Sequence, residues 1–154
     1  MTLAVDVGYG TRHPMAPSAR LLGRWATAAA GRRGVCAVLS LRVVTPQEGR
    51  RLNRDYRGKD YATNVLSFPA GDLPGVNPTP LGDIVICAGV VAREAREQDK
   101  PPRAHWAHMV VHGVLHLLGH DHEDDDEARR MERREIVVLR GLGYPNPYRQ
   151  VPHG

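Results

Sequence analysis

The chain has 154 residues, of which 42% are hydrophobic and 25% charged, and this balance is that of an ordinary globular domain. It excludes a collagen-like repeat, a coiled coil and long-range disorder. The formal net charge is +4, but six of the 17 acidic residues lie within residues 121–127, so the other 147 residues carry a charge of +10. A body this basic favours an anionic partner, with nucleic acid the first candidate, although a general bias toward arginine explains the charge equally well.

Cysteine use and the N-terminus indicate a protein of the cell interior. Cys36 and Cys87 form no CxxC pair and lie in apolar runs, so we expect two buried thiols and no disulfide framework. Residues 1–10 lack the basic head and the long apolar segment of a signal peptide. No run approaches 18 apolar residues, so we expect a cytoplasmic protein with no membrane partner.

Turn residues and apolar periodicity predict strands and helices in alternation. A helical segment that reaches Ala30 follows Ser18, and a capping box at residues 45–48 starts a short helix that ends near Arg54. The other expected elements are strands at 3–7, 35–44, 65–68 and 83–87, a proline-rich loop at 71–80, and helices at 88–98, at 103–119 and from the acidic stretch to about residue 139.

The order of these elements is β-α-β-α-β-β-α-α-α. It predicts an α+β fold in which helices pack on a small mixed sheet of about four strands. Because the chain has no internal repeat and no low-complexity linker, we expect a single domain over residues 1–154.

The expected helix at 103–119 carries the chemistry. Nearly every residue from 104 to 118 is apolar, so this helix should be buried on most sides. Burying polar rings costs free energy unless partners satisfy them. The polar side chains of this segment are four histidines, which fall within roughly 80° of one another around the helix: His105, His108, His112 and His116.

Two of these histidines begin a metal-binding pattern. His112 and His116 are four residues apart, so both rings leave the same face of the helix and reach one metal ion. Gly119 suits the left-handed turn that ends a helix, and His122 follows after it. This is the spacing of the metzincin zinc signature, whose three histidines leave one position for water. We therefore predict one zinc per chain on His112, His116 and His122, and nickel would also suit imidazoles.

Two alternatives to this ligand set stay open. His108 and His112 are also four residues apart, and His120 competes with His122 as the third ligand. With the preferred set, His105 and His108 would donate hydrogen bonds around the site or contact the phosphates of RNA.

Position 113 distinguishes the chain from zinc peptidases. The metzincin signature has a glutamate directly after its first histidine, which acts as the general base, and this chain has Gly113 there. A zinc peptidase without that carboxylate lacks the group that deprotonates the water, so peptidase activity is disfavoured.

The run at 112–122, HGVLHLLGHDH, resembles the HGxLHLxGxDH signature of the YbeY family, the bacterial endoribonucleases of rRNA maturation. His120 replaces the tyrosine that is common in the family at that position. The resemblance covers roughly residues 45–148. Four further segments are similar to family sequences: LNRDYRGKD at 52–60, TNVLSFP at 63–69, LGDI at 81–84 and LGY at 142–144.

The resemblance implies an α+β fold, a zinc ion bound by the three histidines of the motif, and an endoribonuclease that prefers single-stranded RNA. It implies action on the 3′ end of 16S rRNA and a role in ribosome quality control. It also implies that Arg57 is needed. A guanidinium binds phosphate oxygens through two parallel hydrogen bonds, so Arg57, expected in a loop past its helix, is a candidate to stabilise the transition state.

Other residues near these motifs are weaker candidates. Residues 50–59 carry five positive charges against one acid, so Arg50, Arg54 and Lys59 are candidate RNA contacts, although a solvated helix face is as good an interpretation. Asp121 would orient a metal ligand through a hydrogen bond, or equally cap the last helix.

We therefore expect a zinc-dependent endoribonuclease whose partners are single-stranded RNA, the 3′ end of 16S rRNA, and the small ribosomal subunit with its proteins. The alternative is a ribosome assembly factor whose zinc is structural and which has no nuclease activity. The sequence leaves open whether a zinc-activated water or the 2′-hydroxyl of the substrate is the nucleophile.

Overall fold

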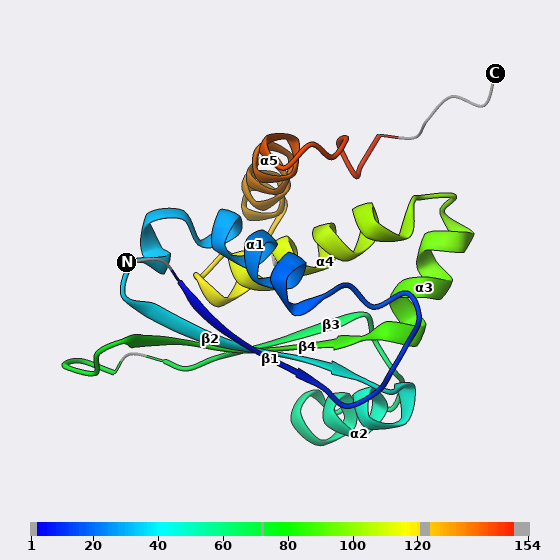
Figure 1. Ribbon diagram of the computed structural model, residues 1–154, viewed down its shortest axis with the longest axis horizontal. Coiled ribbons are helices and arrows are strands. Elements are labelled where there is room, and N and C mark those ends of the chain that lie inside the picture. Colours follow the sequence, from blue (N-terminus) through cyan, green and yellow to red (C-terminus); the bar gives the residue numbers. More distant parts are fainter. Residues whose placement is uncertain (1–2, 72, 121–123, 150–154) are drawn as a thin grey trace.

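The elements follow one another in the expected order (Figure 1). The computed structural model of the protein describes residues 3–71, 73–120 and 124–149. No helix within these residues is long and apolar enough to cross a membrane. The strands are β1 (Ala4–Tyr9), β2 (Ala37–Val44), β3 (Val65–Pro69) and β4 (Thr79–Cys87); the helices are α1 (Ala19–Ala30), α2 (Pro46–Arg57), α3 (Ala88–Glu97), α4 (Pro102–Leu117) and α5 (Asp125–Gly141), and a 3₁₀ turn, η1 (Gly31–Gly34), follows α1.

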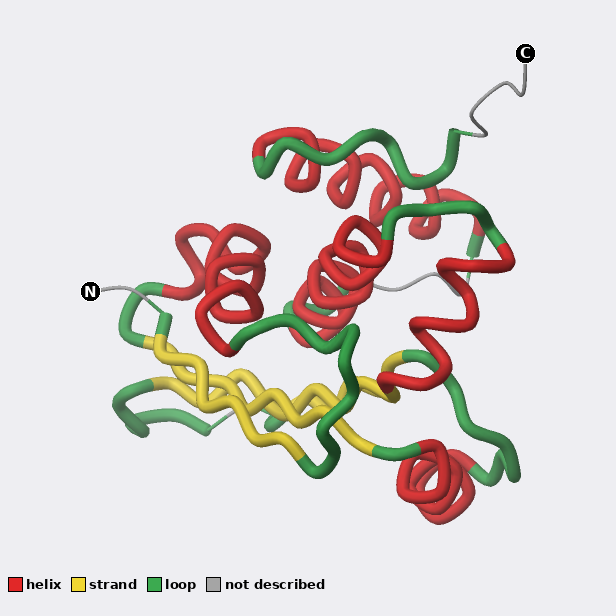
Figure 2. Tube along the Cα trace, turned by 45° about the vertical axis from the view of Figure 1, so that its right-hand side comes forward, coloured by secondary structure: helices red, strands yellow, loops and turns green. Residues whose placement is uncertain are grey.

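The strands form a mixed sheet in the order β1-β2-β4-β3. Strands β1, β2 and β4 are parallel, and β3 runs antiparallel to β4 at one edge. Helices α1 and α4 cover one face of the sheet, α5 lies on the far side of α4, and α2 lies against the opposite face (Figures 1 and 2). The predicted α+β fold with a four-stranded mixed sheet is confirmed.

Helix α4 forms the centre of the main core, between α1, α5 and the sheet. The prediction that it is buried on most sides is confirmed, because its apolar side chains are almost fully enclosed. A smaller apolar cluster, which includes Leu66, Val85 and Cys87, packs with Leu52 of α2 on the other face of the sheet. The most enclosed side chains of α4 are Trp106, Ala107, Val110, Val111, Val114 and Leu115, each at most 1% exposed.

The boundaries of two elements differ from the prediction by three residues or more. Helix α2 continues three residues past Arg54, because Gly58 ends it in the left-handed conformation (φ 70°) and donates its backbone N–H to the carbonyls of Asn53 and Arg54. Arg57 is thus the last residue of α2, and its predicted place in a loop is wrong. Strand β4 begins at Thr79, four residues earlier than predicted, because its first residues pair with the start of β2.

Helix α4 lies close to the sheet at Gly113. A Cβ atom there would lie 3.2 Å from Cγ2 of Ile84 and 3.3 Å from Cγ2 of Val65. The hydroxyl of Ser67 donates a hydrogen bond to the carbonyl oxygen of Gly113 at 3.1 Å, which fixes the helix on β3. Position 113 therefore faces the sheet, and a glutamate at this position would be forced into the packed interface instead of reaching the histidines.

We expect Gly113→Val to lower the free energy of unfolding by about 1–3 kcal/mol, because the added methyl groups overpack the contact with β3 and β4. The measurement is urea unfolding of the purified protein, followed by circular dichroism. Gly141→Val is the matched control, since a Cβ at the end of α5 meets no atom within 4 Å. Equal unfolding midpoints for the two variants would contradict the close packing at Gly113.

Candidate metal centre

The four histidines of α4 form one row along the helix. The ring centroids of successive members lie 6.3, 6.3 and 5.9 Å apart, from His105 through His108 and His112 to His116. The first two rings are buried, at 3% and 8% exposure, whereas His112 and His116 are partly exposed. The predicted stripe is confirmed, and its solvent-accessible end is the pair proposed to bind metal.

A carboxylate of α5 lies against this row. Glu135 is 1% exposed, and its Oε1 lies 3.0 Å from Nδ1 of His112 while its Oε2 contacts Nε2 of His108. The hydroxyl of Tyr148 donates to Oε2 at 2.6 Å. Burial disfavours the charged form of Glu135, but the hydrogen bonds from His108 and His112 outweigh it and hold the pKa of the carboxyl at about 2.

The ionised carboxylate fixes the tautomer of His112. A carboxylate only accepts hydrogen bonds, so Nδ1 of His112 must carry the proton and donate it to Glu135. In the tautomer that donates from Nδ1, the lone pair of the imidazole lies on Nε2, which is the nitrogen that would bind a metal ion. Metal-bound histidines commonly donate their other N–H to a carboxylate in this way, so the residues present fit a zinc site.

His108 has a different role. Its Nε2 is taken by Glu135 and lies 3.3 Å from the hydroxyl of Tyr148, and its Nδ1 is buried. This arrangement disfavours the alternative ligand pair of His108 and His112. The carboxylate also holds Nε2 of His108, so an RNA contact of this residue, which is 8% exposed, stays a prediction that the ring's Nε2 does not support.

His105 is held by a second carboxylate, on α3. Its Nε2 lies 3.0 Å from Oε1 of Glu94, and burial lowers the pKa of the imidazole although Glu94 opposes this. Glu94 also accepts from the side-chain amide of Asn64, at 3.1 and 3.2 Å, and Oδ1 of Asn64 accepts from the backbone N–H of Val65 at 2.7 Å. Asn64, which belongs to one of the family-like segments, therefore joins the start of β3 to α3 and α4.

The third predicted ligand, His122, and the candidate Asp121 lie outside the described residues. Within the described residues no group of three His, Cys, Asp or Glu side chains is placed to hold a metal ion. The glycine turn before His122 is confirmed, since Gly119 has φ 95° and its N–H donates to the carbonyl of His116. His120 is half-buried, and its backbone N–H donates to the carbonyl of Leu115.

The basic candidates lie elsewhere. Arg57 is exposed at the end of α2, on the face of the sheet opposite α4 (Figure 1), so the structure does not bring it together with the histidines. Arg50 is paired with Asp60 through two hydrogen bonds of 2.8 and 2.9 Å, and Nε of Arg54 lies 3.3 Å from Asp55. Two of the predicted RNA contacts thus already have acidic partners, and Lys59 is exposed after the helix.

Sequence reasoning missed Glu135, Glu94 and Tyr148. A signal for Glu135 was present, because this acid occupies the buried stripe of α5 together with Met131, Val138 and Leu139. An acid on the apolar face of a helix needs a partner in the core. Tyr148 follows in an irregular segment, where no periodicity indicates which side chains turn inward.

Known proteins share this sequence and fold. Residues 19–143 match the family described as Endoribonuclease YbeY. The chain is 62% identical to endoribonuclease YbeY of Alkalilimnicola ehrlichii over 130 residues, which cover 82% of this chain and 78% of that protein. It is 55% identical to the protein of the same name from Stenotrophomonas maltophilia over 150 residues, 95% of this chain and 93% of that one. The solution structure of TM1509 from Thermotoga maritima superposes with a TM-score of 0.61 and 25% identity, covering 90% of this chain and 88% of the other.

We expect Glu135→Gln to weaken the binding of cobalt(II) or zinc by about 10- to 100-fold. An amide has one accepting oxygen where the carboxylate has two, so it cannot accept from both histidines in this arrangement and no longer fixes the tautomer of His112. The measurement is competition with a chromophoric chelator, on protein whose fold is verified by circular dichroism. Glu97→Gln, the same change on the exposed side of α3, should leave the affinity unchanged. An affinity of Glu135→Gln equal to that of the control would show that the carboxylate does not orient the ligand.

Proposed function

Because this chain belongs to the family of endoribonucleases YbeY, we propose that it cleaves single-stranded RNA with a zinc ion held by His112, His116 and His122, and that it acts on the 3′ end of 16S rRNA. Family membership makes it an endonuclease that hydrolyses the phosphodiester bonds of RNA. The bound metal, the preference for single-stranded RNA and the ribosomal target are what we propose beyond family membership.

The hydrogen bond between Glu135 and Nδ1 of His112 is the observation that supports a metal most directly. It uses Nδ1 of the ring for a hydrogen bond to a buried carboxylate, which favours the tautomer whose metal-binding lone pair lies on Nε2. His116, one helical turn further, lies beside it with a ring separation of 5.9 Å. A residue set made only for packing would not need an ionised acid of 1% exposure beneath a partly exposed imidazole.

Each residue of the proposed site has a separable task. A zinc ion on three imidazoles would supply the Lewis acidity that activates a water molecule or a phosphodiester oxygen. Glu135 keeps His112 in one tautomer and one orientation. Arg57 is the candidate that binds the phosphate oxygens, and its place across the sheet from α4 requires the RNA to reach around the β3 edge of the sheet.

The basic body of the chain supports an RNA partner of some length. Outside residues 121–127 the charge is +10, which attracts a polyanion over distances well beyond the site itself. The small ribosomal subunit and its proteins, in the cytoplasm, are the setting in which a 3′ end of 16S rRNA is met.

We expect His116→Ala and Arg57→Glu each to lower the cleavage rate of a single-stranded 16S rRNA 3′-end substrate by about 100-fold or more, because one removes a metal ligand and the other a phosphate-binding charge. Arg51→Glu, on the same exposed helix, is the control for the charge change. Product ends identify the nucleophile, since a 2′,3′-cyclic phosphate means that the 2′-hydroxyl attacked.

Cleavage that survives both substitutions would contradict the proposed site. If metal-depleted protein cleaves no RNA yet still binds small subunits and supports rRNA maturation, the chain acts as the assembly factor with a structural zinc. Turnover of unstructured peptides would favour the peptidase alternative, which the packing of Gly113 against β3 and β4 already disfavours.

We expect purified protein to contain about one zinc per chain, and His116→Ala to contain little, when metals are counted by mass spectrometry of the ashed sample. Treatment with a chelator should abolish cleavage, and added zinc should restore it. Full activity after verified metal removal would rule out a catalytic metal.

A further inference from the structure

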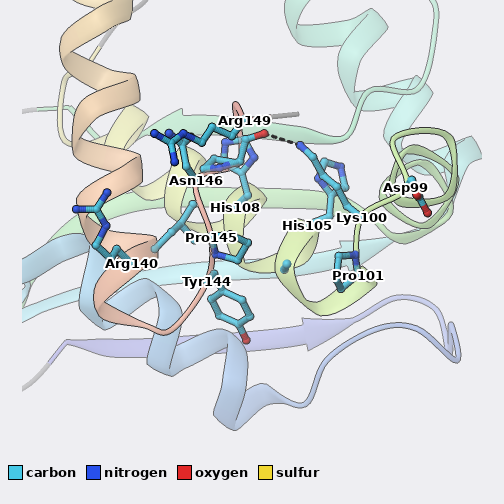
Figure 3. A pocket seen from close by; sticks show the side chains of 13 residues that line it. Asp99, Lys100, Pro101, His105, His108, Arg140, Tyr144, Pro145, Asn146 and Arg149 are labelled. Atoms are coloured by element: carbon cyan, nitrogen blue, oxygen red, sulfur yellow. Dashed lines mark hydrogen bonds between the residues drawn. The ribbon is translucent and has the colours of Figure 1, made fainter. Parts of the chain in front are cut away.

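A cavity lies at the buried end of the histidine row, beside His105 and His108. It has a volume of about 490 Å³ and is enclosed by the turn after α3, the first half of α4, the end of α5 and the segment 144–149 (Figure 3). His105 and His108 line it from α4, and Tyr144 lines it from the C-terminal segment. We call it the proline cavity, after Pro101, Pro145 and Pro147 in its walls.

The walls combine apolar surface with a few polar groups, which include the side chain of Asn146 and the imidazoles of His105 and His108. The Nδ1 atoms of these two imidazoles are themselves buried and have no hydrogen-bond partner among the described residues. The ring of Tyr144 is held in place by an edge-on contact with Trp25, whose ring centroid lies 6.1 Å away. Apolar walls, fixed rings and a small number of polar groups are the usual composition of a small-molecule site.

The mouth of the proline cavity is positively charged. Arg140 and Arg149 line it and are exposed, and neither forms an ion pair with another described residue. Lys100 also lines it, and its Nζ donates a hydrogen bond to the carbonyl oxygen of Pro147 at 2.8 Å (Figure 3). Asp99 is the one carboxylate among the described lining residues. The positive charge therefore favours an anionic ligand, and the apolar walls favour a ligand with a flat, apolar part.

The cavity lies next to the proposed metal site along α4, since the rings of His108 and His112 are 6.3 Å apart. His108 lines the proline cavity, and His112, one turn later and about 6 Å along the axis, lines a smaller hollow of about 220 Å³ with Glu135 and Tyr148. An RNA strand held at His112 and His116 would therefore have a neighbouring nucleotide near the proline cavity.

We propose that the proline cavity binds one nucleotide of the RNA substrate beside the cleaved bond, with the base against the apolar wall and its phosphate on Arg140 and Arg149. A nucleotide joins a planar base to an anionic phosphate, and the cavity offers an apolar wall for the base and two arginines for the phosphate. The assignment rests on the proposed cleavage of single-stranded RNA.

The test measures binding of a fluorescent, nuclease-resistant 2′-O-methyl phosphorothioate 12-mer to the protein as purified. Arg140→Ala with Arg149→Ala should weaken binding about tenfold and reduce the slope of log affinity against log salt by about 1.4, the value for two lost contacts to a single strand. Ala104→Trp fills the cavity from the half-buried start of α4, and it should weaken binding about tenfold without changing the salt slope.

The control is Arg130→Ala with Arg133→Ala, which removes the same charge from exposed positions of α5 that line none of the described cavities. The proposal is overturned if this control weakens binding as much as the cavity pair, or if Ala104→Trp, folded by circular dichroism, binds like the wild type. Cleavage by the wild-type protein is measured separately. A wild type that cleaves RNA while the cavity variants bind normally refutes the cavity alone, and a wild type that binds through the cavity without cleaving refutes the catalytic proposal alone.

Discussion

One buried negative charge organises the functional half of this molecule. Glu135 sits among apolar side chains of α5, where an ion is stable only if its oxygens are fully engaged. Its three partners come from two parts of the chain: two histidines of α4 and the hydroxyl of Tyr148 after α5. The carboxylate therefore fastens α5 and the C-terminal segment to α4 at one point. Removing any partner leaves the buried charge of Glu135 incompletely compensated, which lowers the stability of the folded protein.

Helix α4 meets opposite demands on its two sides. Toward the sheet it has Gly113, which lets the backbone come close to β3 and β4, and the carbonyl of that glycine accepts from Ser67. Away from the sheet it carries the imidazoles. Close packing on one side gives the histidine row a rigid base, which would hold the two proposed ligands in register for one metal ion. Gly113, which occupies the position of the general base of zinc peptidases, thus also allows α4 to pack closely on the sheet.

The sequence predicts the parts of the site that are local in the chain. The histidine row, the N-cap at Thr45 and the turn at Gly119 depend on spacings of a few residues, and the structure has all three. The contact between His112 and Glu135 joins residues 23 positions apart on two helices, and no local pattern states that these faces meet. The position of Arg57 was missed for another reason: Gly58, and not Arg54, ends α2, so one glycine moved the residue from a loop to a helix.

Pro147 and Tyr148 are neighbours in the chain, yet they serve different hollows. The carbonyl of Pro147 receives Lys100 across the proline cavity, and the hydroxyl of Tyr148 holds the carboxylate beneath His112. One peptide bond joins these two contacts. Residues 142–149 form no strand or helix, yet they complete the walls of both hollows, so both hollows depend on this one irregular segment for their shape.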